Sequence, residues 1–135
     1  MTATTSDRNT PYRDTDLLAV PVAANAVIPA GVIVAANATG FATNGATATT
    51  LTALGRSEDA VDNTGGADGA KTLVVRRGKA FKFANLAGDA VTQASLGKAC
   101  YIADNQTVAA TSGTNTRSVA GTVLGVEADG VWVEI

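Results

Sequence analysis

Carboxylates and glycines gather between residues 58 and 70, in the stretch EDAVDNTGGADGA, where they could form a ligand site. Oxygen atoms of Asp59, Asp62, Asn63 and Asp68 could serve a calcium ion, which takes about six to eight such ligands. Their spacing does not match the EF-hand loop. Asp, Asn and Gly are also the ordinary residues of turns. The favoured interpretation is a solvated turn, and a bound cation is the alternative.

Two other short segments contain the glycine and lysine of a phosphate-binding loop. They are GADGAK at 66–71 and LGKAC at 96–100. Neither has the full spacing of such a loop, and no Ser or Thr follows Lys98. Both are weak indications of phosphate binding.

The residue inventory argues against catalysis. The chain has no histidine, which removes the usual general base near neutral pH and the common Ser-His and Cys-His pairs. The single Cys100 has no partner for an internal disulfide, and no Cys/His set has zinc-like spacing. We therefore expect a protein that is not an enzyme and that has no cofactor and no metal site.

The charge and hydropathy patterns exclude further classes. A net charge of −2 and a pI near 4.9 disfavour direct nucleic-acid binding. Residues 17–55 carry no charge, but Pro21 and Pro29 interrupt them, so they do not predict a membrane span. The N-terminal residues lack the pattern of an export signal, so we expect synthesis in the cytoplasm.

The elements expected to position these residues are mainly strands. Residues 1–16 are polar and lack a periodic apolar face, which predicts an extended, flexible arm. From residue 17 to 135 short β-branched runs alternate with Thr-Gly, Asn-Gly and Asp-Gly turn signals. The sequence therefore predicts one all-β domain, either a compact antiparallel sandwich or a small barrel, preceded by the arm.

Two hairpins and one helical turn stand out in the second half of the chain. Asp129-Gly130 predicts the turn of the last hairpin, with Trp132 and Glu134 on one face of its second strand. The opposite face is expected to carry Thr122, Leu124, Val126, Ala128, Val131, Val133 and Ile135. Residues 100–103 and 107–111 flank DNQ as another hairpin, and residues 91–98 favour a helical turn that Gly97 ends.

The acidic stretch lies between two expected strands, at 49–58 and 71–83. The second should place Leu73, Val75, Phe81 and Phe83 on one face, with a bulge at Gly78. Arg76, Arg77, Lys79 and Lys82 would then form a basic patch, which either meets an acidic partner or is a solvated strand face. Trp132, the only tryptophan, fits an interface and a core position equally well.

Four phrases in the chain occur in an order that resembles a known family. They are PVAANAVIPAGVIVAANATGFA, VDNTGGADGAKTLVVRRGKAFKFAN, GKACYIADNQTVAAT and RSVAGTVLGVEADGVWVEI. This order is similar to that of the capsid decoration, or cement, proteins of tailed bacteriophages and prophages. The resemblance extends from about Pro21 to Ile135, is stronger in the C-terminal half, and includes no catalytic motif.

The resemblance implies a β-rich virion protein that binds the outside of an expanded head and stabilises it against internal DNA pressure. It implies the major capsid protein of a tailed phage as partner, association with itself as a homotrimer, and synthesis in the cytoplasm of a bacterial host. Neither nucleic acid nor a membrane is an expected partner. The expected interface residues come from the chain's own pattern and are Tyr12, Arg13, Arg76, Arg77, Lys79, Lys82 and Trp132.

Other functions remain open at this stage. A tail-tube or head-completion protein of a phage has a similar composition, but it would form rings or tubes by itself. An adhesin-like β module also fits the composition, although an adhesin should carry an export signal.

Overall fold

The computed structural model describes residues 2–135, and its fold is nearly all β, as the sequence predicts. One sheet has the strand order β1 (Leu17–Pro21), β7 (Thr72–Arg76), β5 (Thr52–Ser57), β3 (Ile33–Ala36) and β4 (Ala42–Asn44). All neighbouring strands in this sheet are antiparallel. Strands β2 (Val27–Ile28) and β6 (Val61–Asp62) form a small separate ladder beside it.

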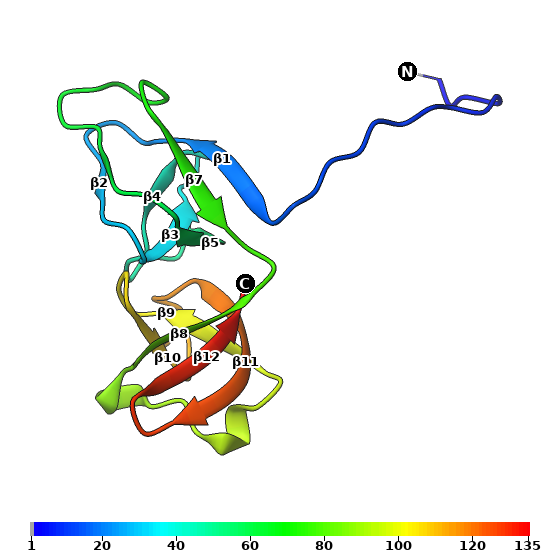
Figure 1. The fold of residues 1–135 in the computed structure, drawn as a ribbon. Coiled ribbons are helices and arrows are strands. Elements are labelled where there is room, and N and C mark those ends of the chain that lie inside the picture. Colours follow the sequence, from blue (N-terminus) through cyan, green and yellow to red (C-terminus); the bar gives the residue numbers. More distant parts are fainter. Residues whose placement is uncertain (1) are drawn as a thin grey trace.

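A closed barrel forms the second half of the molecule (Figure 1). Its strands, in order around the barrel, are β10 (Thr107–Ala109), β8 (Ala80–Asn85), β12 (Gly130–Glu134), β11 (Val119–Glu127) and β9 (Ala99–Ile102). Only the β8 and β10 pair is parallel. Two 3-10 turns, η1 (Ala87–Asp89) and η2 (Gln93–Ser95), lie between β8 and β9. No helix in residues 2–135 is long and apolar enough to cross a bilayer.

The molecule has two hydrophobic cores, and strand β3 contributes to both. Ile33 and Ala35 are buried with the barrel residues, whereas Val34 is buried in the core of the first sheet. This follows from the alternation of side chains along a strand. Leu51 and Ala53, from β5 and the residue before it, also pack against the barrel core. One face of the sheet therefore packs against the barrel core.

The strand expected at 71–83 is in fact two strands, which corrects the sequence-based interpretation. β7 belongs to the sheet and β8 to the barrel, and Gly78 lies in the connection with a φ of 71°. Glycine adopts a positive φ with little strain, so the chain can turn at this position. Gly78 therefore lies in a crossover between the sheet and the barrel and is not a bulge. The predicted apolar residues are all buried, but Leu73 and Val75 lie in one core and Phe81 and Phe83 in the other.

The last hairpin forms as expected, with two differences in detail. Its strands pair Glu127 with Gly130, so Ala128 and Asp129 are the turn residues. A register shift between Val123 and Gly125 also breaks the expected alternation, because it turns Val123 inward and leaves Leu124 exposed. On the second strand the alternation is as predicted, with Val131 and Val133 buried.

Two further local predictions are confirmed, whereas the stretch 58–70, expected as a solvated turn, contains strand β6 and the buried Asn63. β9 and β10 form the expected hairpin, and η2 followed by Gly97, with a φ of 79°, is the expected helical turn. Residues 2–16 contain no strand or helix and are exposed throughout. They extend away from the folded body as an arm (Figure 1).

Candidate functional site

The polar atoms of the acidic loop hold the loop together. Asp62 Oδ1 accepts a hydrogen bond from Thr64 N at 2.9 Å and another from the Thr64 hydroxyl, and these bonds lower the pKa of Asp62. Asp68 Oδ1 accepts one from Ala24 N at 2.8 Å. The buried Asn63 donates to the carbonyl oxygens of Ala23 and Ala67. Within residues 2–135 no three acidic, His or Cys residues cluster as metal ligands.

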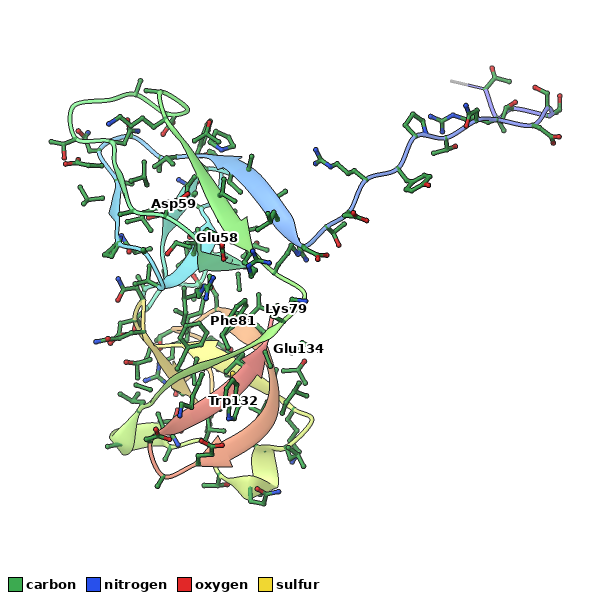
Figure 2. All side chains as sticks on the ribbon, viewed as in Figure 1. Glu58, Asp59, Lys79, Phe81, Trp132 and Glu134 are labelled. Atoms are coloured by element: carbon green, nitrogen blue, oxygen red, sulfur yellow. The ribbon has the colours of Figure 1, made fainter. Side chains whose placement is uncertain are left out.

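Arg76, one of the expected interface residues, is held by a partner within the fold. Its Nε donates to Glu58 Oε1 at 2.7 Å, and its Nη2 donates to Oε2 at 3.3 Å. Arg56 also bonds Glu58, and its Cζ lies 5.3 Å from the centre of the Phe81 ring. Hydrogen bonding to Arg76 is the main cause that lowers the pKa of Glu58. This cluster lies where the sheet meets the barrel, near the Glu58 and Phe81 labels in Figure 2.

Arg77 and Lys79 differ from Arg76 in their surroundings. Neither makes an ion pair with any side chain of residues 2–135; Lys79 is exposed and Arg77 is half-buried. The backbone N–H of Arg77 donates to the carbonyl of Asp16 at 2.9 Å. The base of the arm is thus fixed beside two cationic side chains that have charge available for a partner.

Trp132 and Lys82 lie together on the outside of the barrel. The Lys82 ammonium is 5.7 Å from the centre of the Trp132 ring, and Trp132 Nε1 donates to Glu127 Oε1 at 3.1 Å. Lys82 also donates to Asp129 Oδ2 at 2.8 Å, which is the main cause of the raised pKa of Lys82. Trp132 is 36% exposed and, as its label in Figure 2 shows, lies on β12.

The bulge on β11 gives this face its shape. Gly125 pairs with Trp132, and a Cβ placed on Gly125 would lie 3.4 Å from Trp132 Cδ1, in ordinary van der Waals contact. The indole ring therefore lies close against β11. The exposed Leu124 precedes Gly125 in the same bulge. We call Lys82, Leu124 and Trp132 the tryptophan face.

The arm residues Tyr12 and Arg13 lie apart from this face. The Tyr12 side chain is 97% exposed, and Arg13 is exposed as well. The only side-chain hydrogen bonds of the arm, within the described chain, join Thr4 and Ser6 near its tip. An exposed tyrosine on an extended segment offers a large contact area to a partner at a low cost in side-chain entropy.

The structure thus places six of the seven expected interface residues at three sites. Lys82 and Trp132 share one face, Arg77 and Lys79 lie at the crossover, and Tyr12 and Arg13 lie on the arm; Arg76 is committed to Glu58. Sequence reasoning missed Leu124, Glu58 and Glu127. Glu127 and Asp129 lie beside the predicted last turn, and their charges could have indicated an ion pair there. A strand paired with that hairpin would bring a cation such as Lys82 near them.

Comparison of the chain with protein-family models, with curated proteins and with solved structures finds no match.

Proposed function

We propose that this protein is a decoration protein of a tailed-phage head. It binds the outer surface of the expanded capsid through the major capsid protein, acts as a homotrimer, and stabilises the shell against the pressure of packaged DNA. The order of the four sequence phrases selects this function. The structural observation that supports it most is the exposed arm. Residues 2–16 extend from the β body and contribute no residue to its two hydrophobic cores.

The arm is suited to extend a small contact surface. A chain of 15 residues, from Thr2 to Asp16, spans up to about 50 Å, whereas a folded body of this size has a radius of gyration of about 14 Å. An arm of this length reaches across the boundary between neighbouring coat subunits. Ordering it on a partner costs entropy, which the burial of Tyr12 and the pairing of Arg13 offset.

The crossover supplies the charge for coat recognition. Arg77 and Lys79 have no anionic partner within residues 2–135, in contrast to Arg76 and Lys82. They lie where the arm leaves the body, so an acidic coat surface contacted by the arm would also meet these cations. Such rim charges mainly affect the association rate and the salt dependence of binding.

Trimer formation would convert weak contacts into firm attachment. When three linked subunits engage three coat sites, the second and third contacts form at a high effective concentration. A closed trimer also matches the local threefold environments of an icosahedral shell. Stabilisation of the shell then follows from contacts that bridge several coat subunits.

The function is tested by co-sedimentation of the purified protein with expanded heads that lack it, prepared from the phage or prophage that encodes it. We expect saturable binding, which is weakened by deletion of residues 1–16 and by the double variant Arg77→Glu, Lys79→Glu. Lys98→Glu is the matched control, because Lys98 is exposed and makes no ion pair within the described chain. Absence of wild-type binding to intact heads would overturn the proposal.

A tail-tube or head-completion role is the second candidate. Its support is a pair of strand ends, Thr52–Ala53 of β5 and Val119 of β11, where each strand is paired with one neighbour only and offers hydrogen-bonding groups to other copies. A protein of that kind would assemble into rings or tubes by itself, and electron microscopy of the isolated protein separates the two functions.

A further inference from the structure

A groove of about 450 Å³ lies where the sheet meets the barrel. Two segments line it, residues 49–53 from the sheet side and residues 117–120 from the barrel side. Ser118 joins the two segments at its base: its hydroxyl donates to Ala48 O at 2.6 Å and accepts from Leu51 N at 3.1 Å. These hydrogen bonds therefore fix the two sides of the groove relative to each other.

On each side of the groove, part of a strand is paired with one neighbour only. Thr52 and Ala53 of β5 pair with β3, but the β7 ladder reaches only Arg56 and Ser57. Likewise β11 pairs with β9 at Val119, whereas its pairing with β12 starts only at Thr122. One-sided edges of this kind accept an added strand, as in β-augmentation.

The side chains that line the groove are small or aliphatic, except for that of Arg117. Thr49, Thr52, Ala53 and Ala120 leave room for a backbone to approach, and Val119 is 49% exposed. Such a surface suits an extended segment with small side chains and no charge.

The first residues of the arm have this composition. Thr2–Ser6 reads TATTS, which is uncharged and rich in the β-branched Thr. Within the described chain this segment bonds only to itself, through the short contacts between Thr4 and Ser6. Figure 1 shows that it lies far from the body to which it belongs. A groove on a second copy is thus within reach of an arm that can span about 50 Å.

Charge complementarity supports the same pairing. Arg117 is the only charged residue that lines the groove within the described chain. Its Nη1 donates to Asp89 Oδ2 at 2.9 Å and to Thr111 O at 3.2 Å, while its Nε is buried and has no partner among residues 2–135. A guanidinium group carries five donors, and the Nη2 of Arg117 makes no hydrogen bond with residues 2–135, so it stays available to a second carboxylate beside Asp89. Asp7 follows the TATTS segment directly.

We infer that the groove binds the N-terminal segment Thr2–Asp7 of a second copy of this chain, with the segment added as a strand to the β5 edge and Asp7 directed to Arg117. Exchange of arms in this manner joins copies around a ring. The inference rests on the proposed function and deepens it by assigning the subunit contacts of the trimer, and it makes the arm part of the trimer before any capsid is present.

The test uses cysteine pairs on separate copies. Thr4→Cys and Val119→Cys proteins are purified singly, mixed and oxidised, and cross-linked dimers containing one of each are quantified by mass spectrometry. Leu124→Cys replaces Val119→Cys as the control, because Leu124 is equally exposed, at 48%, but lies outside the groove. The native Cys100 is buried and stays out of the reaction.

We expect the mixed product of Thr4→Cys and Val119→Cys to exceed the Leu124→Cys control by about tenfold, and we expect Val119→Arg to weaken self-association by about tenfold. Equal cross-linking of the Val119→Cys and Leu124→Cys variants, or cross-linking only within a single chain that carries both changes, would overturn the inference. Head binding is measured separately. Loss of the cross-link with intact head binding refutes the arm exchange alone, and loss of head binding with an intact cross-link refutes the capsid role alone.

Discussion

Ile33 and Val34 are consecutive residues of β3, both have no exposed surface, and they belong to different hydrophobic cores. Ile33 packs with the barrel residues, and Val34 packs in the other core with buried residues of β1, β2, β4 and β7. One short strand thus ties the two halves of the molecule together. Neither core can lose β3 without disturbing the other.

The shared strand predicts cooperative unfolding of the whole body. Truncation of a buried Ile to Ala typically costs about 2–5 kcal/mol, so we expect Ile33→Ala to lower the stability by that amount. The transition should remain single, because loss of the barrel core removes the support of the sheet core. Calorimetry together with near-UV circular dichroism checks this result, and two separate transitions in the variant would show that the halves fold independently.

The close approach of β5 to the end of β7 predicts a strict requirement for glycine at position 55. Gly55 has a φ of 150°, and a Cβ placed on it would overlap the carbonyl oxygen of Arg76. We expect Gly55→Ala to destabilise the protein by at least about 2 kcal/mol, since backbone atoms must move. Gly88→Ala is the control, because no atom lies within 4 Å of its added Cβ, and it should change stability by less than about 0.5 kcal/mol. Denaturant midpoints of the two variants give the comparison.

The Glu58 cluster predicts a loss of stability in acid. Hydrogen bonds from Arg76 and then Arg56 lower the pKa of Glu58 from its ordinary value of 4.5. A carboxyl group with a lowered pKa in the folded state binds protons first in the unfolded state. Its contribution is therefore complete above about pH 4.5 and is lost as the pH falls through the folded-state pKa.

We expect the melting temperature of Glu58→Gln to lie below that of the wild type at pH 7, and the difference to shrink as the pH falls below about 4.5. Thermal melts between about pH 7 and about pH 3 measure this difference. A gap that stays constant over the whole range would show that the charge of Glu58 does not stabilise the fold.

Cys100 is predicted to be unreactive in the folded protein. Its side chain has no exposed surface, burial is the main cause that raises its pKa to about 11, and its thiol donates to Gly121 O at 3.7 Å. The thiolate is the reactive form, so a thiol reagent at about pH 8 should modify Cys100 only after denaturant is added. Rapid labelling of the native protein would contradict the burial of this side chain.

The strand content, two hairpins and the helical turn before β9 were predictable from the sequence, because each depends on local residue types. The division of the molecule into two hydrophobic cores was not predictable from the sequence. Leu73 and Val75 show the same alternation as Phe81 and Phe83, and only the chain direction at Gly78 separates the two pairs. Local patterns report which face is apolar, but they do not report which core that face enters.

The candidate surfaces were predictable only in part. Trp132 was expected opposite the buried Val131 and Val133, and it lies there. The pairing of Arg76 with Glu58 depends on contacts between β5 and β7, which are 18 residues apart in sequence at this point. The turn at Gly113, Thr114 and Asn115 has three consecutive positive φ values, and Thr rarely adopts this conformation, so the residue type at position 114 gave no signal for it.

The capsid role is tested most directly by imaging expanded heads after incubation with the purified protein. We expect added density at fixed, symmetry-related positions on the outer surface, with three copies of the β body around each position. We also expect decorated heads to withstand heating that opens undecorated heads. Bare shells at saturating protein concentration, or density that follows no lattice position, would show that the protein does not decorate the head.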